Sequence, residues 1–309
     1  MSYGGSMKNK IITSGLVVLF VGLLFQVVSA KRSMSDLMTD LKGYDPLARA
    51  KAVKELSAQG EKAKEVIPLL VELALKDPAL YVRKEAKATI QKLGKNARGA
   101  APLLVKAVWQ DEDNEVKQAA IDTLGMMGKN ASLAASDLAS LLTHKDPWVK
   151  QYAYFGLDKM GKNAKGAVGK LTEVLDSDNS DSRKFACTIL GSLEEHAKLA
   201  LPKMEKLMLH DTESIVRSNC AFGISYMGKH ATAAVPSLIK ALDDQDANVK
   251  RAVIHALGDM GLEAKKALPK LKTFMKDDMR QPSSVEGQEE ERELQQLARE
   301  AIQKITEKP

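Results

Sequence analysis

Residues 77–109 read DPALYVRKEAKATIQKLGKNARGAAPLLVKAVW, and this stretch decides the fold. In its first half, Ala86, Ile90 and Leu93 follow Val82 at spacings that place apolar side chains on one face of a helix. The pattern predicts a helix that begins close to Val82 and ends close to Leu93.

The second half of the stretch predicts a turn and another helix. Gly94 directly follows the last apolar position, where a glycine commonly ends a helix. Pro102 suits the first turn of the next helix, whose apolar face carries Leu104, Ala107 and Val108. The whole stretch therefore reads as helix, short turn, helix.

The same helical pair recurs along the chain with a period of 33 or 34 residues. A basic residue marks the first helix of successive copies, at Arg83, Lys117, Lys150, Arg183, Arg217 and Lys250. The turn position is held by Gly60, Gly94, Gly128, Gly161, Glu194, Gly228 and Gly261. A fixed period of this length with two helices in each copy is typical of an α-solenoid.

The recurring pattern V-[RK]-x-x-A-x-x-x-[LI]-x-x-[ML]-G-x-x-A-x-x-A-x-P-x-L resembles the HEAT repeat, in particular the short HEAT-like repeats first named for phycobilin lyases. The resemblance covers residues 45–277, where several columns agree over six or seven copies. It implies an all-α fold, a right-handed α-α superhelix of the HEAT-like solenoid type. It implies little about chemistry, because such repeats mostly serve as binding scaffolds.

The pattern divides the chain into five parts. We expect a signal peptide or membrane anchor in residues 1–30, a capping helix in 31–44 and seven repeats in 45–276. Residues 277–291 contain proline, serine, glycine and a run of glutamates, which predicts a flexible acidic loop. The apolar spacing resumes in residues 292–309, which we expect to form a second capping helix, because a terminal repeat exposes a face without a neighbour.

Residues 11–30 form an apolar segment that, at 1.5 Å per residue, spans about 30 Å as a helix and is long enough to cross a bilayer. Lys8 and Lys10 precede it, and its last three residues, Val-Ser-Ala, are of the small type that signal peptidases favour. Lys31 and Arg32 follow directly, which suits an uncleaved anchor equally well. Both readings predict a hydrophobic N-terminal helix that takes the chain to a membrane. Both place the repeats in the cell envelope, at a periplasmic or other extracytoplasmic location.

The chain contains two cysteines, Cys187 and Cys220, and both occupy columns that hold core residues in other repeats. We therefore expect them to be free, buried thiols. They lie one repeat apart, on helices whose axes should be about 8–10 Å apart. A disulfide needs Cα atoms within about 7 Å, so this spacing argues against a bond between them.

The sequence offers no constellation of residues for catalysis. Its five histidines form no His-Glu pair of the kind that HEAT-repeat iron hydroxylases carry, and neither a P-loop nor a Gly-rich dinucleotide motif is present. The Gly-Lys-Asn-Ala segment recurs as a turn between helices rather than as a phosphate loop. We therefore expect no enzyme activity, no metal site and no cofactor.

The basic residues that recur in the first helices of successive repeats have two interpretations. A regular row of cations could follow the phosphates of a nucleic acid. However, the 46 basic residues are offset by 40 acidic ones, and an acidic residue stands at the start of the helix in each repeat. Related solenoids use such pairs as a ladder between repeats, so we favour the ladder and do not expect a nucleic-acid partner.

The second helices change character along the chain, from apolar in the first repeats to basic in the last. An apolar patch beside basic residues favours a groove for a protein or peptide on the concave face. The alternative is that residues 31–44 or the membrane cover the apolar positions. The candidate partner-binding residues are Leu69, Val71, Leu103, Val105, Lys106, Trp109, Lys203, Lys206, Lys240 and Lys270.

Together these patterns predict a non-catalytic scaffold or adaptor of the cell envelope that binds a protein or peptide. Two alternatives remain open. A phycobilin-lyase-like enzyme or chaperone would rest on the resemblance of the repeats alone. A nucleic-acid-binding solenoid would rest on the basic column, and export to the envelope argues against it.

Overall fold

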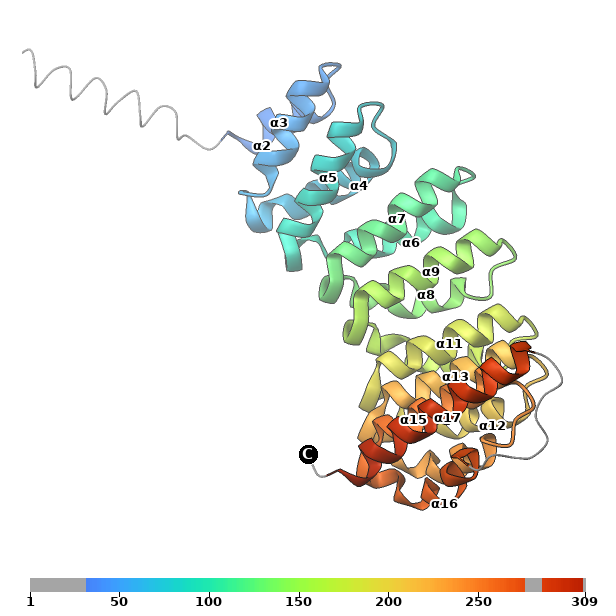
Figure 1. Cartoon of the computed structure of the whole chain (residues 1–309). Coiled ribbons are helices and arrows are strands. Elements are labelled where there is room, and N and C mark those ends of the chain that lie inside the picture. Colours follow the sequence, from blue (N-terminus) through green and yellow to red (C-terminus); the bar gives the residue numbers. More distant parts are fainter. Residues whose placement is uncertain (1–31, 276–284, 308–309) are drawn as a thin grey trace, which may run out of the picture.

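In the computed structural model, which describes residues 32–275 and 285–307, the helices stack side by side in chain order from α2 to α17 (Figure 1). Neither of these two ranges contains a strand, so the all-α prediction is confirmed. The handedness of the superhelix stays a prediction. The hydrophobic helix expected in residues 11–30 lies outside the described residues.

Seven helical pairs form the body of the stack, and in Figure 1 their first helices make one layer with the second helices behind it. The first helices are α3 (Pro46–Leu56), α5 (Leu80–Leu93), α7 (Asn114–Met127), α9 (Pro147–Met160), α11 (Ser180–Ser192), α13 (Ser214–Tyr226) and α15 (Ala247–Asp259). The second helices are α4 (Ile67–Lys76), α6 (Ala100–Gln110), α8 (Ala135–Leu141), α10 (Val168–Val174), α12 (Leu201–His210), α14 (Val235–Ala241) and α16 (Leu268–Leu271).

A 3-10 helix joins the two helices of each pair, where the sequence predicted only a short turn. In six of the seven pairs its first residue is a glycine with φ from 50° to 58°, a conformation that L-residues rarely adopt. Glu194 takes the same position with φ 49°. These segments are η1 (Gly60–Val66), η2 (Gly94–Ala97), η3 (Gly128–Ala134), η4 (Gly161–Ala167), η5 (Glu194–Ala200), η6 (Gly228–Ala234) and η7 (Gly261–Ala267), and η8 (Lys272–Met275) follows α16.

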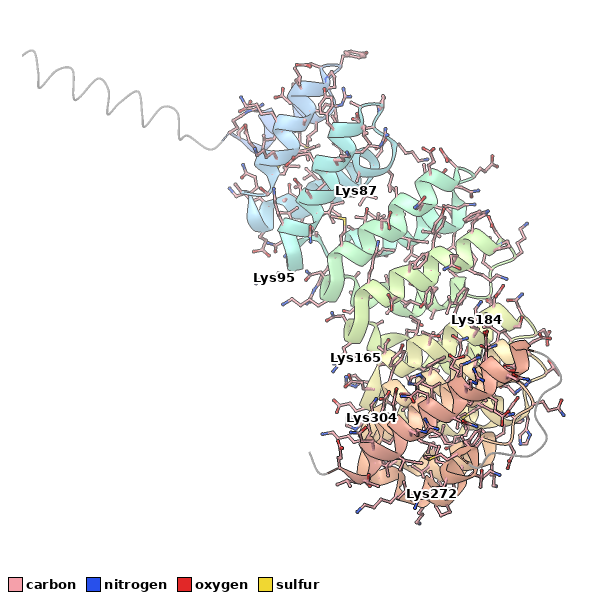
Figure 2. The ribbon with its side chains drawn as sticks, in the orientation of Figure 1. Lys87, Lys95, Lys165, Lys184, Lys272 and Lys304 are labelled. Carbon is pink, nitrogen blue, oxygen red and sulfur yellow. A yellow bond between two sulfur atoms is a disulfide. The ribbon has the colours of Figure 1, made fainter. Side chains whose placement is uncertain are left out.

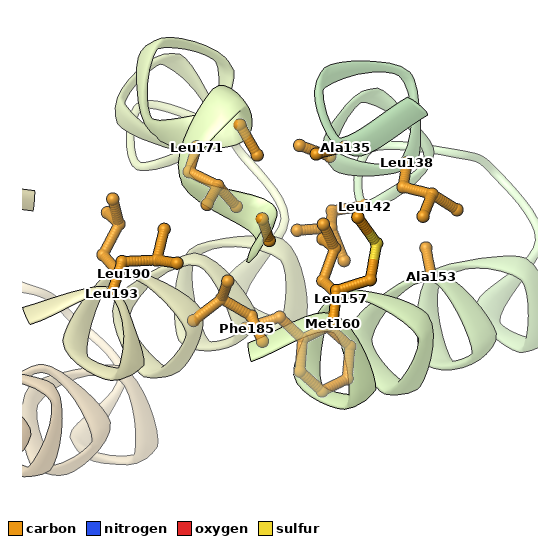
Figure 3. Packing of buried hydrophobic residues seen from close by; sticks show 14 of the residues in the cluster. Ala135, Leu138, Leu142, Ala153, Leu157, Met160, Leu171, Phe185, Leu190 and Leu193 are labelled. Atoms are coloured by element: carbon orange, nitrogen blue, oxygen red, sulfur yellow. The ribbon is translucent and has the colours of Figure 1, made fainter. Parts of the chain in front are cut away.

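One continuous apolar core runs through the stack between the two layers of helices. Figure 3 shows a part of it, where Leu138, Leu157 and Leu171 point inward from neighbouring helices. Full burial of a leucine side chain stabilises a fold by about 2 kcal/mol, so the repeated columns supply much of the stability. Small residues alternate with the leucines, as at Ala135 and Ala153, which lets the helices approach closely.

Helices cover both ends of the stack. At one end Leu37 and Leu41 of α2 (Met34–Leu41) are buried against the first repeat, as predicted for a cap. At the other end α17 (Val285–Thr306) buries Leu294 and Ile305. The prediction of a loop up to residue 291 was wrong, because α17 already begins at Val285. Glutamate favours helices and suits their N-terminal turns, so the acidic run belongs to the helix rather than to a loop.

The expectation of free thiols was also wrong. Cys187 on α11 and Cys220 on α13 form a disulfide, and their Cα atoms lie 4.9 Å apart. The spacing argument failed because glycines face each other at this crossing: a Cβ built on Gly191 would lie 2.5 Å from the Cα of Gly223. Without side chains between them, α11 and α13 pack closer than ordinary helices do.

Candidate partner-binding surface

Two neighbouring second helices, α4 and α6, enclose a groove of about 440 Å³ that we call the α4/α6 groove. Its lining combines apolar and charged side chains. The lining consists of Pro68, Val71, Glu72, Leu75, Lys76, Leu103, Lys106, Ala107, Gln110 and Asp111. This combination can hold an apolar side chain while charged groups on the rim orient the rest of a ligand.

The structure brings only some of the predicted apolar residues to this surface. Leu103 is half-buried and lines the groove, whereas Leu69, also half-buried, lines a separate pocket towards Leu41 and Arg49. Val71 and Val105 are 5% and 6% exposed, so they belong to the core and offer little to a partner. The sequence pattern placed them on the outer face because it did not account for the lateral packing between successive second helices.

Trp109 is the largest exposed apolar side chain of α6, with 47% of its surface accessible. Its ring meets the His144 ring edge-on, with 5.6 Å between the centroids. His144 is itself held in place, because its Nδ1 accepts a hydrogen bond from the Asp146 backbone N–H at 3.0 Å. A tryptophan that is fixed from one side and exposed on the other is well suited to anchor a partner.

The predicted basic residues divide into paired and unpaired groups. The Lys203 ammonium contacts Asp176 of the preceding repeat at 2.5 Å, and Lys270 contacts Asp243 at the same distance. Both cations are therefore largely neutralised. Lys206 and Lys240 are exposed, and neither has a hydrogen bond or ion pair within the described part of the chain. Lys106 in the α4/α6 groove is likewise exposed and unpaired among the described residues.

A ladder between repeats is present at three places, two of them in the predicted column, at Arg183 and Arg217, and one before it, at Arg49. In each, an arginine of one first helix donates two hydrogen bonds to an aspartate at the start of the next repeat, and both side chains are largely buried. The pairs are Arg49 with Asp77, Arg183 with Asp211 and Arg217 with Asp244. These residues stabilise the stack and are not available to a nucleic acid.

Sequence reasoning missed a second surface, an aromatic cluster on the first helices of the middle repeats. Tyr154 stacks on Phe185 with 4.7 Å between ring centroids and also meets Phe155 at 5.5 Å. Trp148 and Tyr226 are exposed on the same set of helices. A signal was present in the sequence, because the position of Phe155 is aromatic again at Phe222, whereas other repeats have small or polar residues there, namely Ala88, Asp122, Thr188 and His255.

Residues 32–275 and 285–307 contain neither a metal-binding cluster nor a membrane-spanning helix. No group of three or more histidine, cysteine, aspartate or glutamate side chains in these ranges is arranged to hold a metal ion. No helix in the same ranges combines the length and the apolar character needed to cross a bilayer. The segment expected to reach a membrane, residues 11–30, lies outside them.

Comparison with known proteins places the repeats in a family. The model of the HEAT repeats matches residues 135–225 and 201–282. Karyopherin Kap121p, in complexes with Nup53p and with the SUMO protease Ulp1p, superposes on 88% of this chain with 14% identity and a TM-score of 0.55. The chain spans 33% of Kap121p, so the likeness concerns the fold of one part of that protein.

Two further results limit the comparison. The structure of Escherichia coli YibA covers all of both chains at 18% identity, but a TM-score of 0.43 is too low to support an inference. No curated protein matches the sequence. The recurring columns, the stacked helical pairs and the matching family model agree that residues 135–282 consist of HEAT repeats, and the helical pairs before residue 135 belong to the same stack.

Proposed function

We infer that this protein is a non-catalytic scaffold that binds a protein or peptide partner on the face formed by its second helices, expected to be the concave one. The observation that carries the inference is the partly apolar α4/α6 groove, and Trp109 is exposed on α6, the same helix that contributes Leu103 and Lys106 to its lining. An exposed apolar surface with a charged rim is typical of protein-binding sites. Kap121p is bound to Nup53p in one structure and to the SUMO protease Ulp1p in another, which supports this use of a HEAT solenoid.

A photo-crosslinking residue at Lys106 tests this function. The same residue at Lys84, which is exposed on α5 in the first-helix layer, serves as the matched control. We expect a defined adduct from position 106 and none of that mass from position 84. The double substitution Leu103→Ala and Trp109→Ala should abolish the adduct while the far-ultraviolet circular dichroism stays unchanged. Equal adducts from both positions would contradict the proposal.

We further propose that the scaffold works in the cell envelope. The apolar residues 11–30 are one support, and the disulfide between Cys187 and Cys220 is a second, since disulfides persist mainly in oxidising compartments. Protease added to intact spheroplasts should then digest the repeats, whereas a cytosolic control protein stays intact. Mass spectrometry of the N-terminus distinguishes cleavage, with Lys31 first, from an anchor that keeps the segment. Complete protection from protease would overturn this location.

A further inference from the structure

The three formed pairs of the ladder share one geometry. In each, the arginine Nη1 donates to two backbone carbonyls in the loop that precedes its own helix. This anchoring leaves Nε and Nη2 to face the next repeat, where they donate to the two carboxylate oxygens of one aspartate at 2.6–2.9 Å. Charge-assisted, bidentate contacts of this type are among the stronger hydrogen bonds in proteins.

The Arg83 guanidinium is anchored in the same way, but it does not pair with an aspartate of the next repeat. Its Nη1 donates to the Asp77 and Pro78 carbonyls at 2.6 and 3.3 Å, as in the formed pairs. Its expected partner is Asp111, the residue that corresponds to Asp77, Asp211 and Asp244 in the formed pairs. However, Asp111 contacts the Lys76 ammonium at 2.5 Å instead. Within the described residues the Nε and Nη2 groups of Arg83 have no hydrogen-bond partner.

Lys76 explains why this pair differs from the others. It directly precedes Asp77 at the end of α4, and from there its side chain reaches the next repeat. None of the five following repeat boundaries has a lysine at this position, so at none of them does a lysine from this position compete for the aspartate. The corresponding residues are Gln110, Thr143, Asp176, His210 and Asp243.

The space between α5 and α7 leaves room for a rearrangement. A cavity of about 590 Å³ lies there, lined by Arg83, Lys87, Asp111 and Val116 among others. Lys87, labelled in Figure 2, is half-buried, and no described residue hydrogen-bonds to its ammonium group. Burial lowers the pKa of Lys87, against the opposing effect of the Asp122 carboxylate. Closing the cavity on Asp111 would bring a carboxylate towards both Arg83 and Lys87.

We propose that Asp111 exchanges between Lys76 and Arg83, and that this exchange sets the separation of α5 and α7, so that the solenoid bends at the boundary between its second and third repeats. In one state Asp111 holds Lys76 and the boundary is open, as seen here. In the other state Asp111 completes the bidentate pair with Arg83 and the boundary closes. Each state keeps one ion pair for the carboxylate, and a ligand or substitution that favours one state shifts the balance between the two.

Spin labels placed in pairs across the boundary test the exchange. Tyr81→Cys on α5 and Glu115→Cys on α7 report on this boundary. The equivalent exposed positions on α13 and α15, Ile215→Cys and Asn248→Cys, report on a boundary where the arginine pair is formed. Both pairs are labelled without reductant, so that the native disulfide stays intact. Double electron–electron resonance then gives the distance distribution of each pair.

We expect a broader distribution at 81/115 than at 215/248. Lys76→Met frees Asp111, so it should shorten and narrow the 81/115 distances and leave the 215/248 distances unchanged. Adding Arg83→Gln should cancel that shortening, because the second partner is then lost. Unchanged 81/115 distances in Lys76→Met, or shortening that persists with Arg83→Gln, would overturn the exchange.

The exchange also bears on the partner surface, because Lys76 and Asp111 line the α4/α6 groove. A carboxylate of a partner that takes Lys76 would release Asp111 in the same way as Lys76→Met. This coupling rests on the proposed function, whereas the label experiment uses the free protein. The experiment therefore decides on the exchange even if the crosslinking at Lys106 finds no partner.

Discussion

Gly191 on α11 and Gly223 on α13 lie against each other with no side chain between them. A Cβ on Gly191 would come within 2.5 Å of the Gly223 Cα, and a Cβ on Gly223 would overlap the carbonyl oxygen of Cys187. Backbone meets backbone here, so neither neighbour can move aside cheaply. The close crossing explains how two cysteines one repeat apart come within bonding reach.

Gly223→Ala should therefore destabilise the protein by about 2–3 kcal/mol, because overpacked cores force the backbone apart. Gly169→Ala on α10 is the matched control, since a Cβ there meets nothing within 4 Å. Because alanine favours a helix more than glycine does, Gly169→Ala should stabilise the protein by about 0.5–1 kcal/mol. Urea unfolding of both variants measures the difference. Similar effects of the two substitutions would show that the crossing tolerates a methyl group.

The disulfide should stabilise the stack mainly by restricting the unfolded chain. Cys187 and Cys220 are 33 residues apart, and closing a loop of that size is worth about 3–4 kcal/mol in the chain-entropy description. Reductant should lower the urea midpoint of the wild-type protein accordingly. The double variant Cys187→Ala and Cys220→Ala should have a low midpoint that reductant does not change. A wild-type midpoint that ignores reductant, with both thiols titrated as free, would contradict the bond.

Much of the fold could be predicted because one sequence motif is repeated along the chain. The columns of Ala86, Ile90 and Leu93 are buried as the helical spacing predicts, and Gly94 has the positive φ expected of a helix stop. The 3-10 segment after Gly94 could not be predicted from the apolar spacing, which indicates only where the two helices begin and end. Local periodicity determines such elements, so a single sequence suffices for them.

Contacts between repeats were harder to predict, because they depend on how close two helices come. The general helix spacing excluded the disulfide, yet the glycines at 191 and 223 reduce that spacing locally. The same limit applies to the candidate surface. The spacing of Val71 and Val105 from the proline of each second helix predicted that both side chains point outward. Both are buried instead, because successive second helices pack against each other. Lys106 and Trp109 are exposed as predicted.

Glu194 is the only described residue other than glycine with a positive φ, and it replaces the turn glycine of the other repeats. An L-residue in this region carries strain of about 1–2 kcal/mol. A glycine here avoids that strain, but it loses more conformational entropy on folding, which offsets part of the gain. The Glu194 carboxylate also contacts the Lys162 ammonium at 2.8 Å, and solvent screens this exposed pair.

We therefore expect Glu194→Gly to stabilise by about 0.5–1 kcal/mol when it is made in a Lys162→Ala background, which removes the ion pair from the comparison. Gly228→Ala, at the equivalent turn of the next repeat, should destabilise by about 1 kcal/mol or more. Thermal unfolding of the three variants gives the comparison. If Glu194→Gly destabilises in that background, the backbone at 194 is not strained.

The aspartates of the ladder make the free energy of unfolding depend on pH. Burial alone would raise the pKa of Asp244, but hydrogen bonds from Arg217 and from the Asp246 backbone N–H outweigh it, so the pKa lies below its ordinary value. Burial and hydrogen bonds from Arg49 act in the same way on the pKa of Asp77. A lowered folded-state pKa means that the unfolded chain takes up protons first as the solution is acidified.

The contribution of the Arg217–Asp244 pair should accordingly be complete above the unfolded-state pKa of about 3.9 and decline as the pH falls from there through the lower folded-state pKa. Asp244→Asn keeps an acceptor for the Asp246 N–H but removes the charge, and at pH 7 it should cost about 2–3 kcal/mol, because Arg217 then lies largely buried without its counter-ion. Urea unfolding from pH 7 to pH 3 should show this difference shrink only below about pH 4.

Asp137→Asn, at an exposed site on α8 without an ion pair in the described structure, is the control. Its free energy of unfolding should follow that of the wild type at every pH. A gap between wild type and Asp244→Asn that stays constant down to pH 3 would show that charge at Asp244 does not stabilise the ladder.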